Sequence, residues 1–489
     1  MRSRELPVFP LTPEPVRPGV SPRVEAVEGG VQAAGPVHGP RIALITLGCD
    51  KNTVDSERMM ASLVGHGARV SSEVDGAEVV IVNTCGFIEA AKEQSIETIL
   101  EACERKSAGA VKAVVAVGCM VQRYKEELRH EIPDVDLFMG LTELDGLIPE
   151  LQRRDVLPPP ERIPVMERPL RILSSEAPHS SFLKISEGCD HTCAFCAIPL
   201  MRGLHRSQPL ESLVGEARAL GEAGVRELNI ISQDTTWWGR DLRRRDRNAP
   251  LLPDLLQALL EGTTVDWYRL FYMYPSGITP SLVELMARSA GTESGPRIVP
   301  YLDLPLQHGS DRMLEAMRRP ERRATIRERV GWLREAVPGL TLRTTVIVGF
   351  PGETEEDFDE LVGLLEEIRF DRVGAFAYSI EEGTRAAELD GHLSESLKRE
   401  RLEALMDVQR GISLDRNLDS VGTRTALLVE RTLEDDPDAV AVGRTEGQAS
   451  DVDGVTYLVD LGGSAPGEIV EVEIVDAMEH DLVARVVMP

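Results

Sequence analysis

The stretch SEGCDHTCAFCAIP, residues 186–199, carries the strongest signal in this chain. It places Cys189, Cys193 and Cys196 in a C-x3-C-x2-C group, directly after an apolar run that we predict to be a strand. Three thiolates on one loop can hold three irons of a 4Fe-4S cluster and leave the fourth iron open. The spacing therefore favours an iron-sulfur site at which an exogenous molecule can bind metal.

A structural zinc site is the alternative interpretation of this loop. Structural zinc requires four closed ligands, and neither His191 nor His205 stands at the spacing of a standard finger. The seven cysteines of this 489-residue chain also do not suit a disulfide framework. We interpret most of them as metal ligands.

Around the cysteine loop, short apolar runs alternate with helical patterns. This alternation predicts a partial (βα) barrel of the TIM type over residues 180–418, although periodicity alone does not distinguish a barrel from an open sheet. The predicted strands are residues 181–188, 225–233, 268–275, 299–307, 340–350 and 372–380.

Residues 41–154 show the same alternation and predict a separate, doubly wound parallel α/β domain. Cys49, Cys85 and Cys119 each stand at the carboxyl end of a predicted strand, and such ends lie side by side at the ligand crevice. This favours a second cluster, again with three thiolates and one iron open to a sulfur species. The alternative is that each thiol is a small core side chain, which is our interpretation of Cys103 within a predicted helix.

Three further segments complete the predicted domain organisation. Residues 1–40 are predicted to be a disordered tail and residues 155–179 an extended, proline-rich linker. Residues 419–489 contain short alternating segments separated by Gly, Asp and Pro, which predict a small antiparallel β-barrel.

The charge of the chain bears on its partners. The formal net charge is −27, and residues 421–489 contain fifteen acidic and four basic side chains. Such a surface is repelled by phosphate backbones and attracts basic proteins, although it also serves solubility. The sequence lacks a run of eighteen apolar residues and a signal peptide, so we expect a cytoplasmic protein with no membrane partner.

The cysteine loop, with Phe195 before its last cysteine, resembles the radical S-adenosylmethionine (SAM) superfamily. Two three-cysteine groups followed by a barrel that resembles the TRAM module are similar to the methylthiotransferases. Within these, the branch acting on an aspartate β-carbon of ribosomal small-subunit protein twelve is the most similar. The strings that carry this resemblance include LGCDKNTVDSE, SQDTTWWGRDL, LPLQHGSDRMLEAMRRP and TVIVGFPGETEEDF.

The resemblance implies a radical SAM enzyme that inserts sulfur and a methyl group into an unactivated C–H bond. Its cofactors would be two 4Fe-4S clusters and SAM, and its partners a basic ribosomal protein and an electron donor protein. One candidate SAM-binding residue lies on the cysteine loop, between Cys193 and Cys196. The others lie at the strand ends where barrel active sites form. The candidates are Phe195, Gln233, Asp234, Gln307, His308, Gly349 and Phe350.

Two other functions stay open at this point. A methylthiotransferase that modifies adenosines of tRNA would use the same chemistry on another substrate. A non-catalytic iron-sulfur or zinc protein would use the terminal barrel to bind RNA. The acidic terminal segment favours a basic protein partner, so direct nucleic-acid binding is not expected.

Overall fold

The computed structural model describes residues 25–26, 39–159, 170–173, 178–290, 297–434 and 436–487. The chain divides into two compact units, and each is described here by itself. One unit contains Met1–Glu176 with Leu200–Arg202, and the other contains Ala177–Pro199 with Gly203–Pro489. Most of the predicted tail and linker lies outside the described residues, but β1 (Glu25–Ala26) pairs antiparallel with β7 (Ile172–Leu173).

The first unit is built on a five-stranded sheet in the order β3-β2-β4-β5-β6, with all neighbouring strands parallel. β4 reads VVIVNT and is buried throughout, as expected for a central parallel strand covered on both faces. The strands are β2 (Arg41–Thr46), β3 (Arg69–Ser71), β4 (Val79–Thr84), β5 (Ala113–Gly118) and β6 (Leu137–Gly140).

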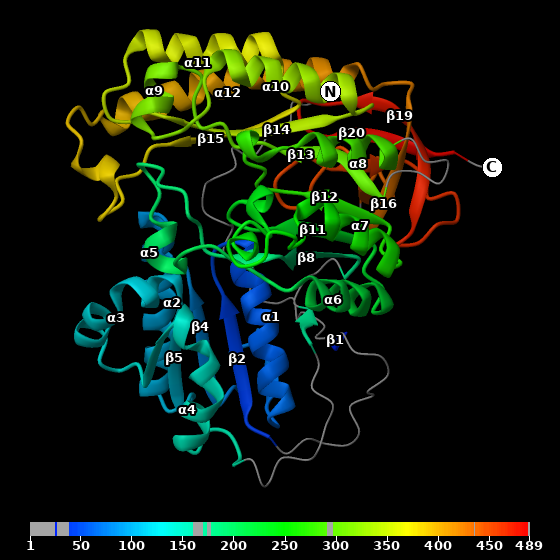
Figure 1. Ribbon diagram of the computed structural model, residues 1–489. Coiled ribbons are helices and arrows are strands. Elements are labelled where there is room, and N and C mark those ends of the chain that lie inside the picture. The colour runs from blue at the N-terminus through cyan, green and yellow to red at the C-terminus, as the bar shows by residue number, and fades with distance from the viewer. Residues whose placement is uncertain are drawn as a thin grey trace. The chain divides into compact units, whose positions relative to one another are not determined.

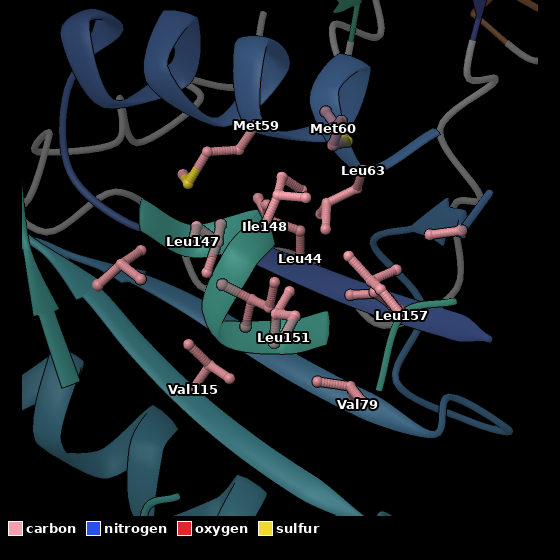
Figure 2. Packing of buried hydrophobic residues seen from close by; sticks show 14 of the residues in the cluster. Leu44, Met59, Met60, Leu63, Val79, Val115, Leu147, Ile148, Leu151 and Leu157 are labelled. Carbon is pink, nitrogen blue, oxygen red and sulfur yellow. The ribbon is translucent and has the colours of Figure 1, made fainter. Parts of the chain in front are cut away.

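Helices cover both faces of this sheet, so the predicted doubly wound domain is confirmed (Figure 1). On one face, Leu63 of α1 and Leu151 of α4 are completely buried against the strands, as Figure 2 shows. Burying a leucine side chain contributes roughly 2 kcal/mol. On the other face, α2 and α3 pack against the strands, and Ile99 and Cys103 of α2 lie in the core. The helices are α1 (Asp50–Gly65), α2 (Glu89–Ser107), α3 (Cys119–Glu131) and α4 (Leu147–Arg153).

The second unit contains a six-stranded parallel sheet whose strands follow one another in chain order. A doubly wound sheet would reverse its strand order at a switch point, whereas this one proceeds steadily as a barrel does. It is not closed, which agrees with the predicted partial barrel. The strands are β8 (Ser180–Lys184), β11 (Glu227–Ile231), β12 (Trp267–Leu270), β13 (Ile298–Asp303), β14 (Thr341–Val348) and β15 (Arg372–Ala377).

Helices connect these strands and pack on the outside of the sheet (Figure 1). Their apolar sides are buried, as Leu255, Leu285 and Leu333 illustrate. The longer helices are α6 (Leu210–Glu222), α7 (Leu252–Gly262), α8 (Pro280–Ala290), α10 (Arg323–Ala336), α11 (Glu355–Ile368) and α12 (Glu395–Leu418).

The end of the second unit is a closed five-stranded barrel in the order β16-β17-β18-β20-β19, which confirms the predicted small β-barrel. Its pairings are antiparallel as predicted, except that β18 and β20 run parallel. Leu427, Val472 and Ala484 are fully buried in its interior. The strands are β16 (Arg424–Thr432), β17 (Ala441–Thr445), β18 (Thr456–Leu458), β19 (Ile469–Ala477) and β20 (Leu482–Val486). In the described part of the chain, no helix has both the length and the apolar character needed to cross a membrane.

Candidate metal centres and their surroundings

Cys49, Cys85 and Cys119 lie at one edge of the first unit's sheet. β2, β4 and β5 are adjacent, with Thr46 opposite Asn83 and Thr84 opposite Gly118. Each cysteine follows its strand within three residues, and two of them also begin or immediately precede a helix. The parallel register thus brings together three residues that are far apart in the sequence.

Two glycines let the three cysteine loops touch. A Cβ added to Gly48 would lie 2.8 Å from the Cβ of Cys85 and 2.9 Å from its Sγ. A Cβ added to Gly86 would lie 2.8 Å from the Cα of Met120, which follows Cys119. Gly48 also has a φ of +96°, a conformation that glycine adopts without strain. Larger residues at these positions would push the loops apart.

Asn52, which is completely buried, connects the same loops by hydrogen bonds. Its Nδ2 donates to the carbonyl oxygens of Leu47 at 2.6 Å and Thr84 at 3.2 Å. Its Oδ1 accepts from the Sγ of Cys119 at 3.7 Å. Arg202, which belongs to the same unit, donates to this Oδ1 at 2.6 Å. Sequence reasoning missed both residues, since neither carries a recognisable spacing signal.

Burial disfavours a negative charge on the thiols of Cys85 and Cys119. It raises the pKa of Cys85, and it raises the pKa of Cys119 to about 12, with neighbouring Cys49 contributing in the same direction. Arg202 opposes the shift at both thiols. The mutual influence of the three sulfurs indicates that they are close neighbours. Metal coordination would compensate the cost of forming buried thiolates.

In the second unit, Cys189, Cys193 and Cys196 lie on the loop that follows β9 (Ser186–Glu187). The loop leads into α5 (Ile198–Arg202), whose last three residues are grouped with the first unit. Backbone bonds hold this loop on two sides, because Ala194 N–H donates to Met317 O and Ala194 O accepts from Ala386 N–H. Phe195 packs against the apolar cluster around Ala194. The loop is therefore positioned by segments distant in sequence.

The thiols of this loop also influence one another. Burial raises the pKa of Cys189 to about 11 and that of Cys196 to about 12, and nearby Cys193 adds to both shifts. Among the described residues, no set of three His, Cys, Asp or Glu side chains is arranged to hold a single metal ion. A 4Fe-4S cluster binds each thiolate to a different iron, so its ligands do not converge on one ion. The donor type and number suit such a cluster.

Asp234 is brought into contact with the cysteine loop. Its Oδ2 lies 2.6 Å from His191 Nε2, and its Oδ1 accepts from Thr236 N–H at 2.9 Å. The His191 ring stacks on Tyr274, with ring centroids 4.0 Å apart. Gln233, beside Asp234, is half-buried. The sequence drew attention to Asp234 but assigned no role to His191 or Tyr274.

Gln307 and His308 lie in the loop that follows β13. Gln307 has a φ of 82°, which is uncommon for a residue with a side chain, and it bridges to Val346 of β14. His308 is buried, its Nδ1 accepts from Ser310 N–H, and its Nε2 therefore donates to Glu353 at 3.3 Å. These bonds make His308 a support for the loop. Direct contact of either residue with SAM stays a prediction.

The turn at residues 349–352 is held by the buried carboxylate of Glu353. Its Oε2 accepts from Gly349 N–H at 2.8 Å, and its Oε1 accepts from Arg401 at 2.6 Å. Gly349 has a φ of +74°, and a Cβ there would lie 2.5 Å from Cγ of Lys398, so a larger residue would be strained. Phe350 is fully buried, with its ring 5.4 Å from that of Tyr378. Sequence reasoning identified the turn but not the residues that hold it.

Comparisons with known proteins cover both units. The model of Uncharacterized protein family UPF0004 matches residues 41–140, that of the Radical SAM superfamily residues 183–365, and that of the TRAM domain residues 421–487. The ribosomal protein uS12 methylthiotransferase RimO of Anaeromyxobacter sp. (strain K) is 45% identical over 91% of this chain and 93% of its own. The chain belongs to the RimO family. The RimO of Geobacter sulfurreducens is 40% identical over 91% of this chain and 98% of its own.

Among solved structures, the radical S-adenosylmethionine methyltransferase TsrM from Kitasatospora setae is similar, with a TM-score of 0.47 and 14% identity over 82% of each chain. The UPF0004 and Radical SAM matches together include all six candidate cysteines. The radical SAM superfamily, to which RimO proteins belong, uses a 4Fe-4S cluster and SAM. The predicted family, fold and enzyme class are therefore confirmed.

Proposed function

We propose that this chain adds a methylthio group to the β-carbon of an aspartate of ribosomal protein uS12. The observation that carries the proposal is two groups of three cysteines, one on a single loop and the other at three neighbouring strand ends. The name shared by relatives that are 40–45% identical over 91% of the chain supports the substrate. We propose that residues 41–154, 180–418 and 419–489 are the three domains that carry this function.

We infer that Cys189, Cys193 and Cys196 hold one 4Fe-4S cluster and that Cys49, Cys85 and Cys119 hold a second. When bound, the first cluster and SAM supply a carbon radical that removes hydrogen from the substrate, and the second supplies a site for sulfur. The missing Cβ at Gly48 and the buried thiols beside it support the second site. Three thiolates at each site leave one coordination position for an outside ligand.

The chain's own residues orient these groups and exclude water. Backbone bonds at Ala194 fix the loop that carries Cys189, Cys193 and Cys196. Asp234 holds His191 beside that loop, and Glu353 fixes the turn at residues 349–352. We propose that Phe195, Gln233, Asp234, Gln307, His308, Gly349 and Phe350 surround SAM. Fixed positions of this kind lower the entropic cost of bringing reactants together.

The partners follow from charge and chemistry. The net charge of −27 and the acidic segment at residues 421–489 favour a basic ribosomal protein over a phosphate backbone. Reductive cleavage of SAM requires one electron, so we infer an electron donor protein. A ribosomal substrate also implies action in the cytoplasm.

Anaerobic reconstitution followed by reaction with purified uS12 tests this function. We expect about eight irons per chain, 5′-deoxyadenosine on reduction with SAM, and a uS12 product heavier by a methylthio group. Nucleoside analysis of tRNA from a deletion strain provides the comparison. Loss of a methylthio-adenosine from tRNA, with uS12 unchanged, would show that the substrate is tRNA instead.

A further inference from the structure

The sulfur of Cys193 has two donor side chains beside it. Arg319 Nη1 donates to Cys193 Sγ at 3.8 Å. The Tyr274 hydroxyl is close enough to the same thiol to interact with it. Cys189 and Cys196 instead have backbone N–H groups nearby, those of His191 and Ile198 respectively. The middle cysteine of the loop thus differs from the other two in having a cation and a phenol directed at it.

Arg319 is held in one orientation. α9 (Asp311–Ala316) ends in a turn in which Arg318 has a φ of 59° and Arg319 N–H returns to Leu314 O. The guanidinium then donates from Nη2 to Pro305 O at 2.8 Å. Its Nε lies 3.3 Å from Glu321 Oε2. With only 5% of its surface exposed, this cation cannot move into solvent.

The guanidinium also begins a stack of planar groups. It lies 3.8 Å from the centroid of the Tyr274 ring, and that ring lies parallel to His191 at 4.0 Å. His191 is in turn fixed by Asp234 at 2.6 Å. The stack therefore runs from Arg319 to the cysteine loop, with a carboxylate at each end. Stacking of this kind limits the freedom of both donors.

We propose that Arg319, assisted by Tyr274, sets the reduction potential of the cluster held by Cys189, Cys193 and Cys196. Hydrogen bonds to cluster sulfurs and nearby positive charge stabilise the reduced state, which carries one more electron. In a buried site that effect is poorly screened by salt. This inference rests on the proposed cluster site. It assigns Arg319 a positioning and electrostatic role.

The test is an EPR-monitored redox titration of the reconstituted full-length protein. The signal that changes when SAM is added belongs to this cluster. R319Q is expected to lower the equilibrium constant for its one-electron reduction about tenfold, a shift of about 59 mV to more negative potential. Y274F, which keeps the ring stack, is expected to shift the potential in the same direction by less. E321Q removes a negative charge and is expected to shift it the opposite way.

R319K is the matched control, because it keeps the charge and loses the planar fork. Its potential is expected to lie between those of wild type and R319Q. If R319Q does not fold, the potentials of Y274F and E321Q still test whether these groups set the reduction potential of the cluster. Unchanged potentials in variants that bind iron normally would overturn this inference and leave the proposed function standing. Absence of the SAM-responsive cluster from the wild-type protein would contradict the proposed function itself.

Discussion

The side chains around a cysteine distinguish a proposed metal ligand from a residue of the hydrophobic core. Cys103 is as deeply buried as Cys119, yet it packs among apolar side chains of α2 and the sheet. Cys119 instead lies beside other thiols and the polar Asn52. Burial alone therefore does not distinguish a ligand from a core residue, whereas the neighbours of the sulfur do.

Replacing Cys189 with Ala is expected to abolish SAM cleavage, because the cluster loses one of three thiolates. Replacing Cys85 with Ala is expected to leave SAM cleavage intact and stop sulfur insertion. Each variant should retain about four of eight irons, measured together with 5′-deoxyadenosine after anaerobic reconstitution. Cys103→Ala is the control and should keep all of them. Full SAM cleavage in Cys189→Ala would refute the assignment.

Loops at the strand ends depend on particular backbone conformations. Gly48→Ala introduces a side chain both at positive φ and against Cys85. We expect this variant to lose most of the iron held by Cys49, Cys85 and Cys119 while keeping SAM cleavage. Gly109→Ala is the control, since Gly109 has a φ of +77° but open space around it. That change should destabilise the unit by about 1 kcal/mol and leave the iron content unchanged.

The strand arrangement and the cysteine positions could be predicted from the sequence, because parallel strands give apolar runs and their ends share an edge. The polar residues that hold the loops could not. Asn52, His191, Arg319 and Glu353 act through partners distant in the chain, which for Glu353 is Arg401, and their types are common on protein surfaces. Only tertiary contacts reveal that these four are structural or electrostatic supports.

Within the second unit, a buried ion cluster joins the terminal barrel to the six-stranded sheet. Glu227 of β11 pairs with Arg269 of β12 at 2.9 Å and with Arg444 of β17 at 2.6 Å. Replacing Arg444 with Met leaves a buried carboxylate short of one cation, at an expected cost of about 3–5 kcal/mol. Faster hydrogen exchange across β16–β20 would report this loss. The exposed Arg485, paired with Glu473, is the control, and its replacement should cost less than about 1 kcal/mol.

The same cluster predicts sensitivity to acid. Burial by itself raises the pKa of Glu227, but Arg444 and Arg269 outweigh burial and lower the pKa to about 2, from an ordinary value of 4.5. The stabilisation is therefore complete above about pH 4.5 and is lost as pH falls toward 2. Unfolding temperatures measured between about pH 6 and pH 3 should fall more steeply for wild type than for Glu227→Gln. Equal slopes would contradict this.

The two cysteine groups differ in how much of the chain must fold before each exists. Positions 189, 193 and 196 share one loop, whereas positions 49, 85 and 119 follow three strands that are neighbours in the sheet, β2, β4 and β5. Closing a short loop is entropically cheap, but joining three strand ends requires the whole parallel sheet. Unfolding of the first unit's sheet should therefore separate positions 49, 85 and 119, whereas positions 189, 193 and 196 stay within a few residues of one another even in an unfolded chain.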